Sequence, residues 1–392
     1  MHKSGEFFLK TKRFKINGKK IETPRKILSS TLDKISESII IKDENVKGIN
    51  EVYRQFNKSK LFNMKQYSSI ERDFLNSITK PIELSFSNTN INFLLLKYDT
   101  RTDAEKKAKS RISNTPTTQE VTYLLDILDN NYNDFIIPPI MPYLTGEQYI
   151  NFLNSFFELN ESFRNKTIAG LIPSFLSRDE QFNILDYYIK KHCKIFIYDL
   201  YGSSPDKHYS SINMLMRESM TYEKEIKEKT FFIATNVRFG RPHRNTPIAP
   251  AKDLLSFYSG FDCFGKAHVQ KIVFDIGENG KPPIIEPPIP RLLNIEDYGY
   301  YVTNNYEILQ NKLTYERENL INRTTGLKQE EQEKMSNVLN TLNHGLEAIR
   351  IRDKLLNNEM ISPYLESKNE LPKQYVEELR DLYRSSLQLT LF

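Results

Sequence analysis

The chain has 392 residues, of which 39% are hydrophobic and 27% charged, and its formal net charge is +5. This length and apolar content support a substantial core and exclude a globally disordered chain. The small basic surplus permits a nucleic-acid partner without requiring one, because such binding depends on clustered charge. Two cysteines, Cys193 and Cys263, are too few for a disulfide framework or a cysteine-rich zinc site. Without a long apolar run or a leader-like start, the chain is expected to be cytoplasmic, with no membrane partner.

The first predicted element is a basic β-hairpin near the N-terminus. The stretch FLKTKRFKINGKKIETP alternates its side chains around Asn17-Gly18, a dipeptide that favours a two-residue hairpin turn. Its cations are candidates for contacts with nucleic-acid phosphates, because lysine and arginine neutralise the phosphate backbone. These candidate nucleic-acid-binding residues are Lys12, Arg13, Lys15, Lys19 and Lys20.

From about residue 80, short apolar runs alternate with amphipathic stretches. We expect strands at 82–87, 91–98, 135–140, 167–175, 194–202, 231–239 and 260–264. We expect helices at 119–132, 146–160, 178–192, 210–229 and 251–260. The third of these helices should begin after Ser177, with Glu180 completing a capping box.

Strands buried on both faces and separated by helices indicate parallel βαβ units. The fold class is therefore predicted to be α/β, as a TIM-like (β/α)₈ barrel with an N-terminal basic β-hairpin and a C-terminal helical appendage. An open, doubly wound sheet is the alternative, although no glycine-rich phosphate loop follows any predicted strand.

The C-terminal part of the chain has a different pattern. Residues 277–293 are proline-rich and predict a turn-rich connection, and charged helical stretches follow from about residue 305. We therefore divide the chain into a barrel with its hairpin at 1–300 and a helical extension at 301–392.

Catalytic groups of barrel enzymes lie at the carboxyl ends of strands and in the loops that follow. Asp199 ends one predicted strand, and Asp262 lies in another, so both are candidate catalytic residues. Each has an alternative role: Asp199 as the cap of a turn, and Asp262 as a hydrogen-bonded brace. Asn236 and Arg238 end a third strand and are candidate substrate-binding residues.

The loop RFGRPHRN follows that third strand and gathers cations. Arg241, His243 and Arg244 are candidates for phosphate contacts, and the alternative is a solvated basic loop. No histidine lies at a metal-ligand spacing from other ligand types, so neither a metal nor a cofactor is expected.

The order of these segments resembles the tRNA-guanine transglycosylase family, which exchanges a guanine in tRNA for a 7-deazaguanine on a modified TIM barrel. The resemblance covers residues 7 to 275 and rests on KRFKINGKKIETP, TPTTQEVTYLLDILDNNYNDFIIP, RNKTIAGLIPSFLSRDEQFNILDYYIKKHCKIFIYDL and TPIAPAKDLLSFYSGFDCF. It implies a nucleic-acid substrate, with tRNA expected over DNA.

The chain departs from that family where the family's chemistry occurs. The family's attacking aspartate would fall at Gly265, and Asp262 matches only an earlier, structural aspartate. The base-pocket aspartates are absent from 85–90 and 138–142, and the zinc cluster is missing. Covalent base exchange needs a carboxylate to hold the sugar, which glycine cannot supply.

Two functions follow from the resemblance and its departures. The first is a non-catalytic nucleic-acid-binding homologue in tRNA 7-deazaguanine modification, partnered by a catalytic paralogue or by a second copy of the chain. The second is a diverged enzyme that exchanges or modifies a guanine in tRNA or DNA, with Asp199 as nucleophile or base. An unrelated barrel enzyme with a small phosphorylated or acidic substrate, and an interaction protein, remain as further alternatives.

Overall fold

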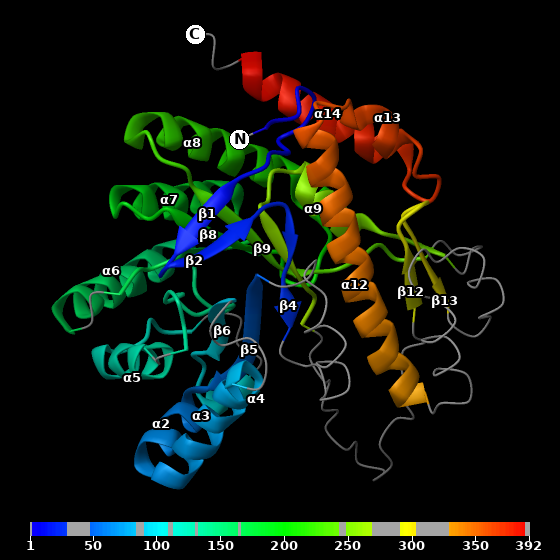
Figure 1. Ribbon diagram of the computed structural model, residues 1–392. Coiled ribbons are helices and arrows are strands. Elements are labelled where there is room, and N and C mark those ends of the chain that lie inside the picture. The colour runs from blue at the N-terminus through cyan, green and yellow to red at the C-terminus, as the bar shows by residue number, and fades with distance from the viewer. Residues whose placement is uncertain are drawn as a thin grey trace.

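The fold is mixed α/β, with parallel strands flanked by helices (Figure 1). In the computed structural model no helix of the described residues is both long and apolar enough to span a bilayer. The structure describes residues 2–29, 48–83, 90–108, 113–129, 132–163, 166–242, 248–268, 291–302 and 329–388.

The largest sheet is parallel and has five strands. Its strands are rich in buried apolar residues, as expected for strands covered on both faces. In spatial order they are β3 (Arg25–Lys26), β11 (Cys263–Lys266), β9 (Phe231–Val237), β8 (Ile195–Asp199) and β7 (Gly170–Pro173).

A second parallel sheet continues from the first with almost no break in the chain. Only Ile27 separates β3 from the first strand of this sheet. Single parallel bridges also join Lys97 to Ile140 and Ile136 to Ile168, which places segment 135–140 between the last strand of this sheet and the start of β7. The three strands are, in order, β4 (Leu28–Ser29), β5 (Ile49–Asn57) and β6 (Ile91–Asp99).

Alternate residues of these strands pack into two separate cores. An inner core joins strands of both sheets and includes Ile27, Ile49, Phe93, Ile197 and Ile233. The intervening residues of the strands face outward into a second core, which they share with the helices. A two-residue side-chain period produces this division, since successive side chains of a strand point to opposite faces.

The helices cover the outer side of the strands (Figure 1). The predicted capping box at Ser177 and Glu180 is confirmed, because each side chain accepts a backbone N–H of the other residue. The helices of this part are α2 (Lys58–Gln66), α3 (Ser68–Glu83), α4 (Asp103–Lys107), α5 (Thr118–Leu128), α6 (Gly146–Phe163), α7 (Arg178–Lys190), α8 (Tyr209–Ile226) and α9 (Leu255–Tyr258).

The C-terminal residues 329–388 form helices, as the charged helical pattern predicts. The long helix α12 packs against β3, and α14 packs against α8 (Figure 1). The helices are α12 (Gln329–Leu356), α13 (Ile361–Glu366) and α14 (Lys373–Gln388).

Two sequence expectations need correction or fall outside the described residues. The strand expected at 82–87 begins inside helix α3, and its remaining residues are not described. The connection expected at 277–293 ends in a strand, and its residues 277–290 are not described. That strand belongs to a small antiparallel sheet of β10 (Ala249–Pro250), β13 (Gly299–Val302) and β12 (Arg291–Asn294).

The basic hairpin is confirmed as two antiparallel strands, β1 (Arg13–Ile16) and β2 (Lys19–Glu22). Asn17 and Gly18 adopt φ values of 48° and 82°, the left-handed conformation that this turn requires. The hairpin lies at the amino ends of the parallel strands: the ring of Phe14 stacks on Phe231, the first residue of β9, at 4.8 Å.

A buried ion pair attaches the hairpin to the large sheet. Lys12 has a side chain that is 1% exposed, and its Nζ donates to Asp262 Oδ2 at 2.8 Å and to the carbonyl of Thr230. The same Oδ2 accepts the backbone N–H of Phe232 at 2.8 Å. Lys12 is therefore a buried structural cation and does not belong to the predicted basic surface. Asp262 has the alternative role given above, that of a hydrogen-bonded brace.

We predict that Lys12→Ala destabilises the fold by about 3–5 kcal/mol, because it leaves the Asp262 carboxylate buried without its cation. Lys15→Ala is the matched control: Lys15 is exposed on the same hairpin, and its replacement should change stability by no more than about 0.5 kcal/mol. Urea unfolding of both variants measures the difference. Equal stabilities would contradict the structural role of Lys12.

Candidate functional site

The predicted site residues lie at two opposite ends of the parallel strands. Asp199 is the last residue of β8, and Asn236 is next to last in β9. Asp262 instead precedes the first residue of β11 and lies with the hairpin at the amino ends. The two candidate catalytic aspartates therefore do not share a site.

Asp199 is a carboxyl group enclosed by protein. Its exposure is 0%, its Oδ1 accepts the backbone N–H of Tyr201 at 3.0 Å, and its Oδ2 has no hydrogen-bond partner among the described residues. Burial raises the pKa of Asp199 to about 6, although the Tyr201 N–H, Asn236, His268 and Lys97 favour its charged form. Asp199 thus caps a turn, and burial brings its pKa closer to neutral pH than that of an ordinary aspartate.

Asn236 ties the ends of neighbouring strands together. It has a φ of 57°, and its backbone carbonyl accepts the N–H of Gly202 at 2.9 Å. Its Oδ1 accepts the backbone N–H of His268 at 2.8 Å, which holds the segment after β11 beside β9. The Asn236 side chain therefore positions the backbone of His268, and it does so beside Asp199.

The predicted basic loop after β9 is only partly described. Arg238 and Arg241 are exposed, and the backbone N–H of Arg238 donates to Ser203 at 3.0 Å. His243 and Arg244 lie outside the described residues. Arg238 and Arg241 are therefore on the same end of the strands as Asp199, with their guanidinium groups accessible.

Glu51 is a site residue that the sequence did not indicate. It lies on β5, it is 0% exposed, and neither of its carboxylate oxygens has a hydrogen-bond partner among the described residues. The Nε2 atom of His268 lies 3.2 Å from Oε2, close enough for charge attraction but without hydrogen-bond alignment. An unsatisfied buried carboxylate is costly to fold around, which makes it a candidate for function.

Two aromatic rings connect Glu51 to Asp199. The rings of Tyr53 and His268 stack with centroids 4.0 Å apart and an interplanar angle of 4°. Burial raises the pKa of the Tyr53 hydroxyl, and the charges of Asp199 and Glu51 raise it further, so this hydroxyl lies within the field of both carboxylates.

Lys97 completes this group of side chains. Its Nζ lies 4.9 Å from the centre of the Tyr201 ring, and burial lowers its pKa although Asp199 opposes the shift. We call Glu51, Tyr53, Lys97, Asp199, Asn236 and His268 the carboxyl-end cluster. Glu51 is the third of the nine residues of β5 and belongs to the group through His268 and through its closeness to Gly265 of β11. Two carboxyl groups, a histidine and a lysine in a desolvated environment provide the means for proton transfer and for attack on an electrophilic carbon.

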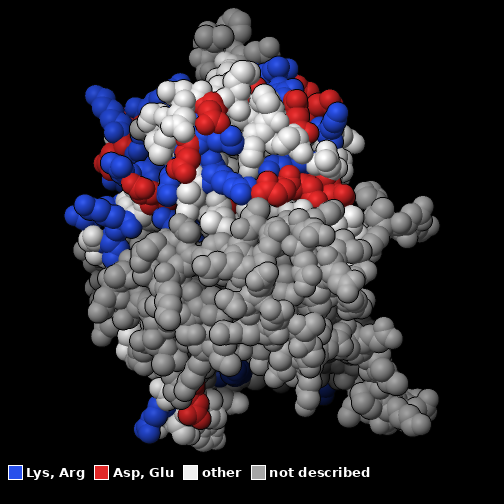
Figure 2. Space-filling view, turned by 45° about the vertical axis from the view of Figure 1, so that its right-hand side comes forward, with Lys and Arg blue, Asp and Glu red and all other residues white. Residues whose placement is uncertain are grey.

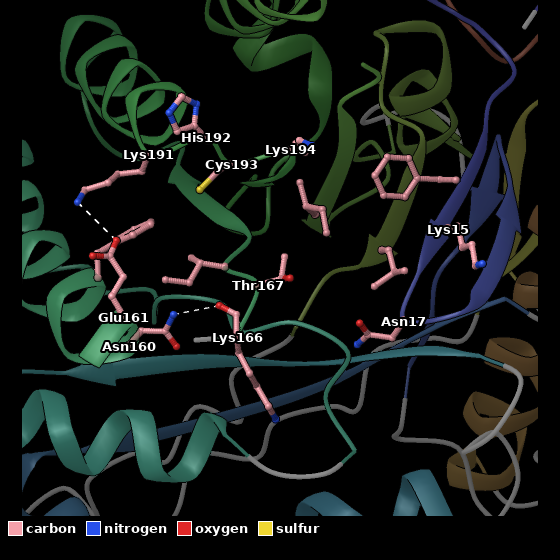
Figure 3. Close-up of a pocket in the computed structure, with 15 residues that line it drawn as sticks. Lys15, Asn17, Asn160, Glu161, Lys166, Thr167, Lys191, His192, Cys193 and Lys194 are labelled. Atoms are coloured by element: carbon pink, nitrogen blue, oxygen red, sulfur yellow. Dashed lines mark hydrogen bonds and ion pairs between the residues drawn. The ribbon is translucent and has the colours of Figure 1, made fainter. Parts of the chain in front are cut away.

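A cavity of about 470 Å³ lies at the opposite end, between the hairpin and the amino end of β8 (Figure 3). Its lysines do not converge on a common point. Lys191 lies 3.7 Å from Glu161, and Lys166 and Lys194 form ion pairs with Asp129 and Glu228. This cavity therefore lacks the convergent polar groups of a catalytic site.

The exposed cations of the hairpin do not form a strong patch. Arg13 pairs with Glu22 at 2.7 Å and Lys19 with Asp134 at 2.7 Å, whereas Lys15 and Lys20 are exposed. On the face shown in Figure 2, lysine and arginine side chains alternate with acidic ones over the described part of the surface. The hairpin cations thus remain candidates for nucleic-acid contact, but at the end remote from Asp199.

Comparison with known proteins finds no matching family model and no matching curated sequence. Within the described residues no group of three or more histidine, cysteine, aspartate or glutamate side chains is placed to hold a metal ion. Cys193 and Cys263 are free buried thiols.

We predict that Asp199→Asn stabilises the protein at pH 7. The folded-state pKa of about 6 exceeds the ordinary value of 3.8, so the stability gained from the bound proton is complete below about pH 4 and lost as pH rises through 6. Asparagine does not ionise, and the variant should exceed the parent by about 3 kcal/mol at pH 7.

Urea unfolding at pH 4, 5, 6 and 7 measures this effect, and the difference should shrink as the pH falls. Asp186→Asn, which removes a half-exposed carboxylate that pairs with Lys190 on α7, is the control variant. A parent and an Asp199→Asn variant with parallel pH profiles would refute the raised pKa.

Proposed function

We propose that the parallel strands close into a (β/α)₈ barrel. The observed pairings support this closure, because they run from β5 through β6, segment 135–140, β7, β8, β9 and β11 to β3, and β4 pairs with β5 again. The inner core, which draws on strands of both sheets, would fill the barrel interior, and the helices would form its outer layer.

We infer that the carboxyl-end cluster is the catalytic centre of this barrel. Barrel enzymes carry their catalytic groups at the carboxyl ends of the strands, where Asp199 and Asn236 lie. Asp199 carries the inference: it is completely buried, one of its oxygens has no partner among the described residues, and it titrates near pH 6. A group of this kind serves as an acid or base at neutral pH.

The substrate class follows from the resemblance to transglycosylases. The protein is proposed to be a diverged pentosyltransferase that replaces a guanine of a nucleic acid, tRNA rather than DNA, with a 7-deazaguanine. Asp199 would protonate the departing guanine, and its carboxylate would then take the proton of the incoming base. Arg238 and Arg241, exposed at the same end, would hold the neighbouring phosphates.

A non-catalytic accessory role is the second candidate, and two observations favour it. Gly265 offers no attacking side chain at the position that the resemblance assigns to it. Asp199 Oδ1 is already engaged by a turn, and Lys97 and Phe175 pack on Tyr201 at the same end of the strands. Such a subunit would bind tRNA beside a catalytic paralogue or a second copy of itself.

Incorporation of radioactive guanine into bulk tRNA and into duplex DNA tests the proposal. The enzyme should label tRNA, and Asp199→Asn should reduce the rate by about 10²–10⁴-fold, because general acid–base catalysis contributes that much. Asp186→Asn should label tRNA at the parent rate, since its side chain lies on α7 away from the cluster.

Two outcomes would contradict the catalytic proposal. One is tRNA that is bound with equal affinity by the parent and by Asp199→Asn and never labelled, which is the result that the accessory role predicts. The other is equal labelling by both proteins. Preferential labelling of DNA would support the base-exchange reaction and contradict tRNA as the substrate.

A further inference from the structure

Glu51 occupies the place that a side chain at position 265 would need. Residue 265 is a glycine, and a Cβ atom built there would lie 2.7 Å from Glu51 Oε2, closer than real Cβ atoms approach any neighbour. With glycine at 265, the carboxylate of Glu51 from β5 occupies this space; because Oε2 is the far end of a flexible side chain, a side chain at 265 would require Glu51 to move.

The carboxylate of Glu51 is enclosed by protein, with an exposure of 0%, but is not hydrogen-bonded to the described residues. His268 approaches Oε2 to 3.2 Å, and its own backbone is held by Asn236. A carboxylate without hydrogen-bond donors retains its lone pairs, and a positioned imidazole can orient it.

A purely structural ion pair with His268 is the alternative role for Glu51. Buried ion pairs that contribute to folding usually satisfy the remaining lone pairs by hydrogen bonds. Here the second oxygen, Oε1, is also without a partner in the described part of the chain. The geometry is costly for a structural pair and suits a group that awaits a substrate atom.

We propose that Glu51 is the nucleophile of the base exchange, relocated to β5 from β11, the strand that contains Gly265. The inference rests on the proposed pentosyltransferase function and names the group that holds the sugar. Asp199 is then the proton carrier, so the two carboxyl groups of the carboxyl-end cluster have separate tasks, as in glycosidases that retain configuration.

The step balances without a further reactant. A lone pair of Glu51 Oε2 forms a bond to C1′ of the nucleotide, the C1′–N9 bond breaks, and its electron pair leaves with the guanine, which takes the proton of Asp199. In the second half the incoming 7-deazaguanine gives its N9 proton to Asp199. Its N9 electron pair then bonds to C1′, and the Glu51–C1′ bond returns its pair to the carboxylate.

Glu51→Gln tests the nucleophile, because the amide keeps the shape and loses the charge. The variant should remain folded, with an unfolding midpoint equal to or above that of the parent, and its guanine exchange should fall at least about a hundredfold. The parent, incubated with tRNA alone and quenched in acidic detergent, should give a covalent protein–tRNA complex. Glu51→Gln should give none, and proteolysis should place the link on Glu51.

A double variant provides a rescue that does not depend on the folding of Glu51→Gln. Glu51→Gly combined with Gly265→Asp vacates the space and returns a carboxylate to position 265. We expect it to exchange guanine at least about tenfold faster than Glu51→Gly alone. The comparison separates loss of a nucleophile from loss of structure.

The outcomes distinguish this inference from the proposed function. A parent protein that neither exchanges guanine nor forms a complex overturns the proposed function. A parent that exchanges guanine, while Glu51→Gln exchanges equally well or the complex is linked elsewhere, overturns only the role of Glu51. If Glu51→Gln proves to be unfolded, the double variant decides the question. A double variant that exchanges guanine no faster than Glu51→Gly then also overturns the role of Glu51.

Discussion

The proposed function depends on two carboxyl groups that are enclosed among parallel strands. Glu51 and Asp199 are both 0% exposed, and three of their four carboxylate oxygens have no hydrogen-bond partner among the described residues. The apolar packing of the inner core has to offset this cost. The proposed chemistry follows from that constraint, because only a strongly stabilised scaffold holds unsatisfied polar groups.

The two ends of the strands have different tasks. At the amino ends, Lys12 and Asp262 form a satisfied ion pair, in which Thr230 and Phe232 also take part, and this pair fixes the hairpin. Glu51 has His268, Lys26 and Lys266 nearby, but neither of its carboxylate oxygens is hydrogen-bonded to the described residues. A buried ion pair whose hydrogen bonds are all made holds its two segments in one position. A buried carboxylate that lacks hydrogen bonds keeps lone pairs free for a reaction.

The sequence could predict the features that have a local physical cause. The hairpin followed from Asn17-Gly18, the start of α7 from Ser177 and Glu180, and β8 from an apolar run ending in Asp199. Strand β5 escaped prediction because polar residues such as the buried Glu51 and the exposed Gln55 interrupt its apolar ones, so no apolar run marks it. Its Ile, Val, Tyr and Phe residues were the available signal, and the contact of Glu51 with Gly265 depends on a tertiary arrangement that no local pattern encodes.

Titration of Asp199 tests the central claim most directly. In protein labelled with ¹³C at aspartate carboxyl carbons, the resonance absent from Asp199→Asn identifies this group, and its shift can be followed from pH 3 to pH 8. The account predicts a midpoint of about 6, because burial disfavours the charged carboxylate. A midpoint at or below the ordinary value of 3.8 would show a solvated or satisfied carboxylate and contradict the account.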